Sequence, residues 1–525
     1  MTSVQRHTLV ATGLGLFMIF LDALIVNVGL PAIQAEFRVG EAGLQWVVTA
    51  YSLGMAVFIM SSATLADLHG RRRLYLAGIA LFTAASIACG LAPDLDALNV
   101  ARGVQGAAAA AVTVTSLALV SAAFPDAKAK ARAIGIWAAI AGVANAVGPT
   151  VGGFLIETVG WRSIFWVNVP FGVVVTLLAL RHVAESRDDH PRTLDLVGQA
   201  LFMAMVGAFA YAVIEGPKRG WLAPVIVGLF AVTAVTLAAF IVYEKRCADP
   251  MMDLTLFRDR TYSMAIVTMC VALFTFYGML LVTTQYLQNV RGFSPVDTGL
   301  FLLPFSLAML VAAPLSGHLV GRIGAVIPIR LGLAIMIAGI VVLIVGTARH
   351  PVLVTTGLAV VGFGFALCGT PITSLAMTSV SPNRAGMASG IMSAQRAIGS
   401  TLGFAVMGSV FAAWLSATLD ADLVRAVPDA QERRAVSASI VAGVNPRAYV
   451  AEIGPARPVR HADPATEAAI LAVAVADFVQ GIRVALGLAI VLLAAVFVAG
   501  LFSFPRGAGA AMADAQQDAK RVDLP

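Results

Sequence analysis

The chain has 525 residues, of which 59% are hydrophobic and only 12% are charged. Because soluble domains carry roughly 25% charged residues, this composition excludes a water-soluble fold for most of the protein. The formal net charge of +6 does not indicate nucleic acid binding, since the Lys and Arg residues lie in short clusters between apolar runs, where membrane topology explains them.

Apolar segments of membrane length recur along the whole chain. A helix needs roughly 20 apolar residues to cross the hydrocarbon core, and runs this long satisfy their backbone in lipid only as helices. Fourteen segments have this length, at 8–30, 44–66, 74–92, 98–121, 133–156, 163–181, 194–214, 221–243, 262–287, 298–320, 328–347, 352–376, 396–416 and 481–503. The sequence therefore predicts an all-α polytopic membrane protein.

The basic residues predict how these spans are oriented. If the N-terminus is cytoplasmic, the segments on its side hold twenty Lys and Arg, and the short loops on the other side hold six. Cytoplasmic loops carry such an excess, so we expect both termini in the cytoplasm. The long stretch 417–480 then lies outside, as a surface loop or as amphipathic helices.

The first span contains an acidic side chain, in the stretch MIFLDALIVNV (18–28). A carboxylate at the bilayer centre costs about 2.5–3.5 kcal/mol on insertion scales. Gly15, Asp22 and Gly29 recur every seven residues and share one helix face, so Asp22 is expected to point at a packed neighbour or a cavity. Three roles are open for it: carrying protons, holding a substrate, or locking two helices together with a hydrogen bond.

The segment ADLHGRRR (66–73) joins the second and third spans on the inner face. Asp67, a glycine suited to a tight turn at Gly70, and the arginines Arg71 and Arg72 form a compact charged hinge. Simple topology is the alternative explanation, because arginines keep a loop inside. Topology does not require Asp67 or Gly70, however.

The fourth span begins with RGVQGAAAAAVT (102–113), which places Arg102 a few residues inside it. Arg102 shares a helix face with Gln105 and Gly106. It either snorkels to the outer interface or serves as a buried cation that biases the proton affinity of a nearby carboxylate.

The fifth span ends in AGVANAVGPTVGG (141–153). Small residues such as Gly148, Gly152 and Gly153 allow close helix approach, and Pro149 removes a backbone donor and bends the helix. The segment is either an ordinary packing interface or a dedicated bending point.

A short internal sequence repeat indicates how the spans are grouped. ATLADLHG (63–70) follows the second span and GHLVGRIG (317–324) follows the tenth, 254 residues later. Two parallel six-helix halves, with two extra helices (194–243) between them, would give this spacing. We therefore expect an N-terminal half at 1–182, the extra helices with their linkers at 183–260, a C-terminal half at 261–505 that includes 417–480, and a cytoplasmic tail at 506–525.

Together these motifs resemble the major facilitator superfamily, in its fourteen-span branch of drug–proton antiporters. The resemblance is carried by LDALIVNVGLP (21–31), ATLADLHGRRR (63–73), RGVQG (102–106), GPTVGG (148–153) and WRSIFWVNVPFG (161–172). Within that branch, GLFMIFLDALIVNV (15–28), TTQYLQNVRGFSP (283–295) and MASGIMSAQRAIGST (387–401) look most like actinobacterial spectinomycin and tetracycline efflux pumps.

The loop motif departs from the family pattern at three positions. Ala63 replaces the opening glycine, Leu68 stands where an arginine is usual, and Gly321 replaces the acid in the second copy. The resemblance implies that Asp67, Gly70, Arg71 and Arg72 steady the outward-open state through contacts at the inner face. Asp126, at the end of the fourth span, is a candidate partner.

The resemblance implies a multidrug efflux transporter of the bacterial cell membrane that works by alternating access. In this hypothesis Asp22 binds a proton from outside and releases it inside, and Arg102 pushes the proton off. GPTVGG is the family's antiporter motif, and Gly148, Pro149, Gly152 and Gly153 form the interface that bends. We expect protons, small-molecule drugs and the lipid bilayer as partners, no cofactor or metal, and a functional monomer.

Candidates for the drug cavity are polar or aromatic residues in spans of low polarity: Trp46, Tyr51, Asn145, Gln285 and Tyr286. Each could equally make an interhelical hydrogen bond.

Rival functions share most of these features. A proton-coupled importer, or an exporter of an endogenous lipid or metabolite, would differ little in sequence. A membrane-embedded enzyme is not expected, because the seven histidines are scattered over both faces. Transport powered by ATP hydrolysis is not expected either, because the sequence lacks the nucleotide-binding motif GxxxxGK[ST].

Overall fold

The computed structural model describes residues 1–124, 126–187, 193–247, 249–348, 350–380, 385–441 and 464–504. Within these ranges the regular structure is helical, without strands. Fourteen helical segments are long and apolar enough to cross a membrane, which confirms the predicted fold class and number of spans.

The helices of the first six spans occupy the N-terminal third of the chain. They are α1 (Ser3–Phe37), α2 (Glu41–His69), α3 (Arg71–Gly90), α4 (Leu95–Ala123), α5 (Ala127–Val159), α6 (Ser163–Trp166) and α7 (Asn168–His182). The short α6 continues into α7, and the two together form the sixth span. The contacts of α1 with α4, α5 and α7 hold this group together.

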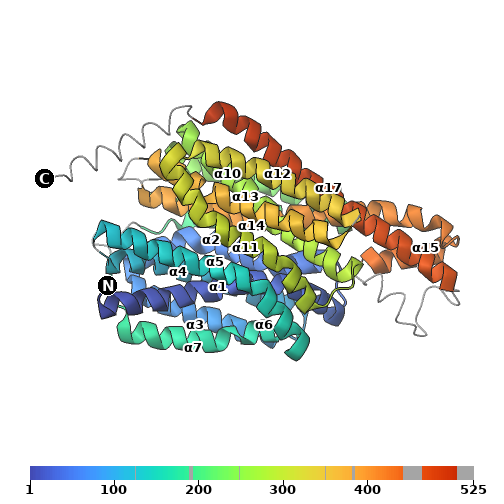
Figure 1. Ribbon diagram of the computed structural model, residues 1–525, viewed down its shortest axis with the longest axis horizontal. Helices are drawn as coiled ribbons and strands as arrows, with labels where there is room; N and C mark the ends of the chain where they lie inside the picture. The colour runs from blue at the N-terminus through green and yellow to red at the C-terminus, as the bar shows by residue number, and fades with distance from the viewer. Residues whose placement is uncertain are drawn as a thin grey trace.

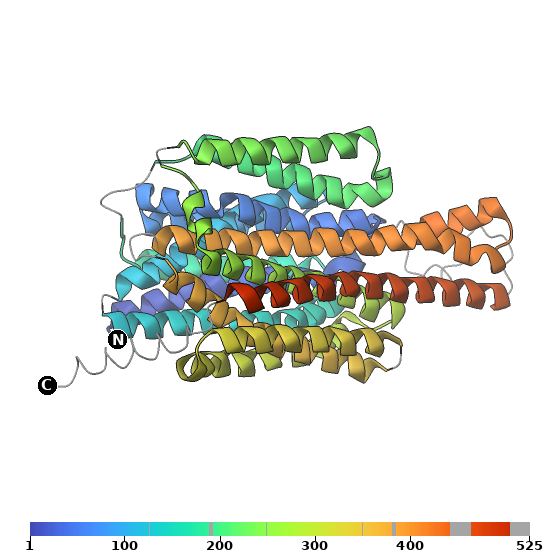
Figure 2. The ribbon, with the colours of Figure 1, turned by 90° about the horizontal axis from the view of Figure 1, so that it is seen from above.

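Two helices follow that pack mainly on each other, α8 (Leu196–Arg219) and α9 (Pro224–Glu244). They form a pair at one edge of the bundle (Figure 2), and α8 also contacts α2 and α14. Little of the α9 span is buried, 11% against 78% for the span that follows it. This apolar and uncovered helix therefore has the surface that lipid contact requires.

The remaining helices belong to the last six spans. They are the 3-10 turn η1 (Leu254–Arg258), α10 (Arg260–Gln285), the π-helical η2 (Tyr286–Val290), α11 (Pro295–Ile323), α12 (Val326–Ala348), α13 (Pro351–Thr378), α14 (Ala385–Asp422), η4 (Leu423–Arg425), α15 (Ala430–Val441) and α17 (Pro464–Ser503). Between the two groups, α5 packs on α11 and α2 packs on α14. With an even number of spans, α1 begins and α17 ends at the same end of the bundle (Figure 1).

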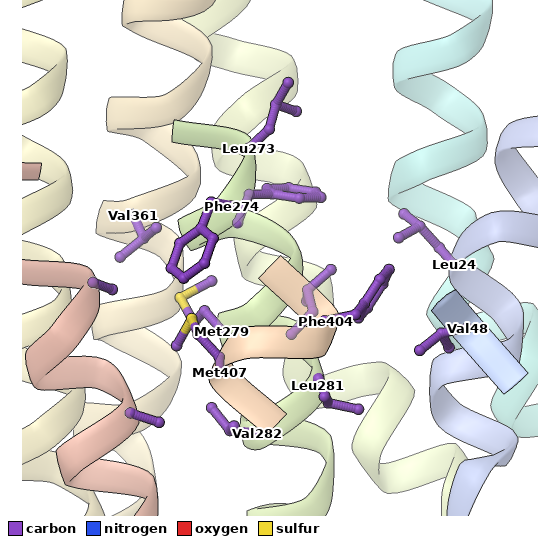
Figure 3. Close-up of a cluster of buried hydrophobic side chains, with 14 of the residues drawn as sticks. Leu24, Val48, Leu273, Phe274, Met279, Leu281, Val282, Val361, Phe404 and Met407 are labelled. Atoms are coloured by element: carbon purple, nitrogen blue, oxygen red, sulfur yellow. The ribbon is translucent and has the colours of Figure 1, made fainter. Parts of the chain in front are cut away.

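The helices of this second group pack closely where glycine permits it. A Cβ atom on Gly403 of α14 would lie 3.0 Å from the Cα atom of Phe274 in α10. Figure 3 shows the resulting cluster, in which Phe274, Met279, Phe404 and Met407 interlock. Small residues at such contacts let helix backbones approach, which is the main source of helix association in lipid.

The stretch 417–480 is largely helical where it is described. α14 runs on to Asp422, α15 follows, and α17 already begins at Pro464. These helices project beyond the rest of the bundle at the end opposite the termini (Figures 1 and 2). Their apolar side chains, among them Leu419, Val436 and Ile470, pack together and continue the hydrophobic core of the C-terminal group.

Candidate functional site

Asp22 and Arg102 form an ion pair inside the N-terminal group of helices. A guanidinium nitrogen of Arg102 lies 2.6 Å from Oδ2 of Asp22. The two side chains are 0% and 1% exposed, so both charges are removed from solvent. Arg102 thus does not snorkel to an interface, and its charge is compensated by the acidic residue of the first span.

The remaining hydrogen-bonding capacity of the pair is filled by neutral groups. Gln105 and Asn168 donate amide hydrogens to Oδ1 of Asp22, at 3.1 and 2.7 Å. Both also donate to Ser86, whose hydroxyl donates to a backbone carbonyl at 2.9 Å. Arg102 donates further to Gln105 Oε1 and to the carbonyl of Val47. The network therefore connects α1, α2, α3, α4 and α7.

An aromatic side chain covers the guanidinium of Arg102. The ring centroid of Tyr51 lies 4.2 Å from its Cζ atom, which is a cation–π distance. The hydroxyl of Tyr51 donates to the carbonyl of Ile19 at 3.4 Å. Tyr51, a drug-cavity candidate, is therefore a buried part of the ion-pair network.

The immediate environment of Asp22 is polar. Its carboxylate accepts hydrogen bonds from three donors, of which one is charged. Buried ion pairs are tolerated when the geometry is good and the remaining lone pairs are satisfied, and both conditions hold here.

The loop between α2 and α3 makes its contacts within the N-terminal group. Arg71 pairs with Asp67 at 2.9 Å, one helical turn back across the junction. Arg72 donates from its side chain to the carbonyls of Ala179 and Leu180 near the end of α7. The loop is thereby fastened to the end of the sixth span and, through the N–H of Arg71 and the carbonyl of Ser186, to the segment after it.

Glu185 in that segment caps the start of α3. Its carboxylate accepts from the backbone N–H groups of Arg72 and Arg73, at 2.9 and 3.2 Å. Gly70 has a φ of 104°, and a Cβ there would lie 2.8 Å from the carboxyl carbon of Glu185. The positive φ requires glycine here, and a Cβ would also displace the carboxylate of Glu185. Asp126, the expected partner of the loop, instead caps α5 by accepting from the N–H of Ala129.

The glycines of the α5 motif lie against two different helices. A Cβ on Gly152 would meet the side chain and backbone of Ile25 in α1, and one on Gly148 would approach Leu24. Gly153 faces α11 instead, where the backbone of Pro295 and Val296 would collide with any side chain. Pro149 lies within α5, between these contacts.

The close glycine contacts between α5 and α11 lie near one end of the helices. Gly299 of α11 abuts the backbone of Pro149, and its carbonyl accepts from the hydroxyl of Thr150 at 3.3 Å. Toward the end of the bundle that carries the termini, a Cβ on Gly142 of α5 or on Gly321 of α11 would have no atom within 4 Å. The two helices therefore separate toward that end.

Other hydrogen bonds between the two groups also lie at the end opposite the termini. Gln288 in η2 donates to the carbonyl of Val28 in α1 at 2.9 Å. Ser409 of α14 donates to Gln45 of α2 at 3.2 Å. These contacts close the space between the groups on that side.

Trp46, a second drug-cavity candidate, packs against α8. Its indole N–H donates to Glu215 at 3.4 Å, and its ring lies 5.8 Å from that of Tyr211. Trp46 therefore lies at the interface between α2 and the helix pair at the edge of the bundle.

The two candidates at the end of α10 are buried within the C-terminal group. The hydroxyl of Tyr286 donates to the carbonyl of Thr347 in α12 and accepts from Arg291 at 2.7 Å. Gln285 is 1% exposed and accepts from Asn289. The last candidate, Asn145, belongs to α5, but its side chain lies outside the described residues.

Four residues of these sites were missed from sequence. Asn168 and Ser86 complete the shell of Asp22, Glu185 holds the α2–α3 loop, and Arg396 is a second arginine within a span. Asn168, Ser86 and Arg396 could have been selected from the sequence, because each is a polar residue in an apolar run. Glu185 lies in a polar segment that carries no such signal.

Comparisons with known proteins agree on one family. A family model described as Major Facilitator Superfamily matches residues 12–404. "Multidrug resistance protein Stp" of Mycobacterium tuberculosis is 59% identical over 98% of this chain and 95% of its own length. "Drug efflux pump JefA" of the same species is 43% identical over 96% and 99%.

A solved structure shares the fold. It is a bacterial homologue of the human lysosomal transporter Spinster in an inward-facing and occupied conformation, with a TM-score of 0.65. The match covers 96% of this chain and 98% of that one at 17% identity.

Proposed function

The chain belongs to the major facilitator superfamily and is therefore a membrane transporter rather than an enzyme, and from this premise we propose that it exports amphipathic drugs in exchange for protons. The names of its relatives support drug export. The observation that supports proton coupling is the buried Asp22–Arg102 pair.

The pair suits proton exchange because its two states differ in charge balance. With Asp22 ionised, the buried network is neutral, and with Asp22 protonated, Arg102 remains as an uncompensated buried charge. Protonation must then be accompanied by movement of Arg102 toward water or another partner. Such a movement couples the proton to helix rearrangement, which is what an antiporter requires.

The arrangement of the helices supports a specific conformation. If both termini are cytoplasmic, as the basic residues predict, the closed end of the bundle faces outward and the α5–α11 separation faces the cytoplasm. We therefore assign an inward-facing state to this structure. Opening to the outside would separate Gly153 from Pro295 and close the space beside Gly142.

The sequence motifs have proposed roles in this exchange between inward-facing and outward-open states. The α2–α3 loop would stabilise the outward-open state through Asp67, Gly70, Arg71 and Arg72. In that state these residues would lose some of the contacts that they make in this structure. The glycines of α5 would let the two six-helix groups, at 1–182 and 261–505, rock against each other. Spectinomycin and tetracycline are candidate substrates, and the functional unit is a monomer in the bacterial cell membrane.

Asp22→Asn tests the proposal in everted membrane vesicles. The wild type should accumulate drug inside these vesicles when a pH gradient is imposed, and an uncoupler should abolish the accumulation. Asp22→Asn should lose both the accumulation and the drug-dependent proton flux, while drug binding to purified protein persists. If the variant still drives drug uphill and still moves protons, Asp22 is not the coupling site.

A matched control is available on the same helix as Arg102. Asp94 caps the start of α4 by accepting from the N–H of Ala97 at 2.8 Å. Asparagine caps a helix about as well as aspartate, so Asp94→Asn removes one carboxylate without breaking a buried pair. Its transport should equal that of the wild type.

A further inference from the structure

The C-terminal group contains an arginine whose surroundings differ from those of Arg102. Arg396 lies about three turns from the start of α14, within a predicted span. The residues on either side of it, Gln395 and Ala397, are buried at 4% exposure each, whereas Arg396 is exposed. Its guanidinium donates to the hydroxyl of Thr373 in α13 at 3.2 Å.

The packing of α14 indicates where Arg396 points. α14 packs against α2, α8 and α17 on its other faces. On the face of Arg396, Gly399 and Gly403 contact α10, and Thr373 belongs to α13. Tyr277 of α10 lies near this guanidinium. The exposed surface of Arg396 therefore opens between α10 and α13, at the end of the bundle where α5 and α11 separate.

Among the described residues no carboxylate forms an ion pair with Arg396, although Arg102 is paired with Asp22. Its hydrogen-bond partner Thr373 is neutral. Charged side chains within membrane spans almost always pair with one another or face a water-filled cavity on a substrate pathway. An anion bound at Arg396 would compensate its charge.

Aromatic rings pack around Tyr277. The ring of Tyr277 is 4.7 Å from that of Phe276 and 5.3 Å from that of Phe404. Phe276 in turn stacks on Phe365 at 4.8 Å. Ligand sites are mostly apolar, with a few polar groups that fix orientation, and a planar guanidinium matches a carboxylate through two parallel hydrogen bonds.

We propose that Arg396 binds the acidic group of the transported compound, so that the substrates include amphipathic aromatic organic acids. This inference rests on the proposed export function and specifies its substrate class. The acid would accept from the guanidinium while its apolar body lies against Tyr277 and the neighbouring rings.

The test compares two dyes that share one aromatic body. Rhodamine B carries a carboxylate, and its ethyl ester masks that carboxylate. Binding of each to the purified full-length protein in detergent is measured by fluorescence anisotropy. The wild type should bind the acid about tenfold more tightly than the ester, as expected for one hydrogen-bonded charge pair. Arg396→Gln should remove this difference by weakening the acid alone, and Arg396→Lys should keep part of it.

Arg483→Gln is the matched control, because Arg483 also donates to a threonine hydroxyl, that of Thr347 at 3.2 Å, but near the closed end. It should leave both affinities unchanged. A wild type that binds the ester as tightly as the acid overturns the inference whether or not any variant folds. So does an Arg396→Gln protein that keeps the preference for the acid. If vesicles show no proton-driven transport, the proposed export function is contradicted. The affinity comparison would still test whether Arg396 binds the acidic group.

Discussion

The Asp22–Arg102 pair predicts that removing one partner destabilises the protein more than removing both. Asp22→Asn leaves a guanidinium that is 1% exposed and has lost its counter-charge. Arginine cannot lose its proton in a protein, so the charge stays buried at every pH. Breaking a buried pair in this way costs about 3–5 kcal/mol. We expect the lower end of that range, because Gln105 and Val47 still accept from Arg102.

Arg102→Gln leaves the carboxyl group of Asp22, which can neutralise itself by taking up a proton. Near neutral pH this uptake costs about 1.4 kcal/mol per pH unit. Gln105 and Asn168 still donate to this carboxyl group. The double variant with both substitutions buries no unpaired charge, so its stability should exceed that of Asp22→Asn.

Thermal unfolding of the purified proteins, followed by tryptophan fluorescence, measures this difference. The midpoint of the double variant should lie above that of Asp22→Asn. Equal midpoints for these two proteins would refute the assignment of a buried, mutually compensating pair.

Three further predictions follow from the other sites. Gly153→Ala should lower drug accumulation in everted vesicles, because the added methyl group overlaps the backbone of α11 at the closed end. Gly142→Ala, in the same helix but facing open space, should leave it unchanged, and equal effects would contradict the role of the contact. Glu185→Gln should lower the stability of the loop after α2 by about 1 kcal/mol through a weaker helix cap, seen as faster protease cleavage there; an unchanged rate would mean that the cap is dispensable. Tyr286→Phe should cost about 1 kcal/mol of stability through the lost hydrogen bond and leave drug affinity unaltered, whereas a loss of affinity would place this side chain in the drug site.

The spans and the ion pair could be predicted because their signals are local. Each span is a long apolar run, and an acid or a base inside such a run stands out. Asp22 and Arg102 were the conspicuous charges of the first and fourth spans, and a buried charge needs a partner.

The surroundings of the pair could not be predicted, because they depend on how helices are rotated. Asn168 belongs to α7, and nothing in its local sequence indicates that it faces Asp22 rather than lipid. The same limit applies to the drug-cavity candidates. Trp46 and Tyr286 were selected by residue type, and helix packing turns one toward α8 and the other toward α12.

Arg396 shows that a charge can be visible in the sequence while its surroundings are not. Only the arrangement of α10, α13 and α14 reveals that no carboxylate among the described residues forms an ion pair with it. Likewise, the helical form of the segment after residue 416 depends on packing between α14, α15 and α17, which single-sequence periodicity does not resolve.

The projecting ends of α14 and α17 have a mechanical consequence. α17 is a single rod of 40 residues, or about 60 Å at 1.5 Å per residue. If it pivots near its middle, a tilt of about 10° displaces its tip by about 5 Å. The tip thus magnifies a motion that is small at the centre of the membrane, and a spectroscopic label placed there would report each reorientation without touching the route of the drug.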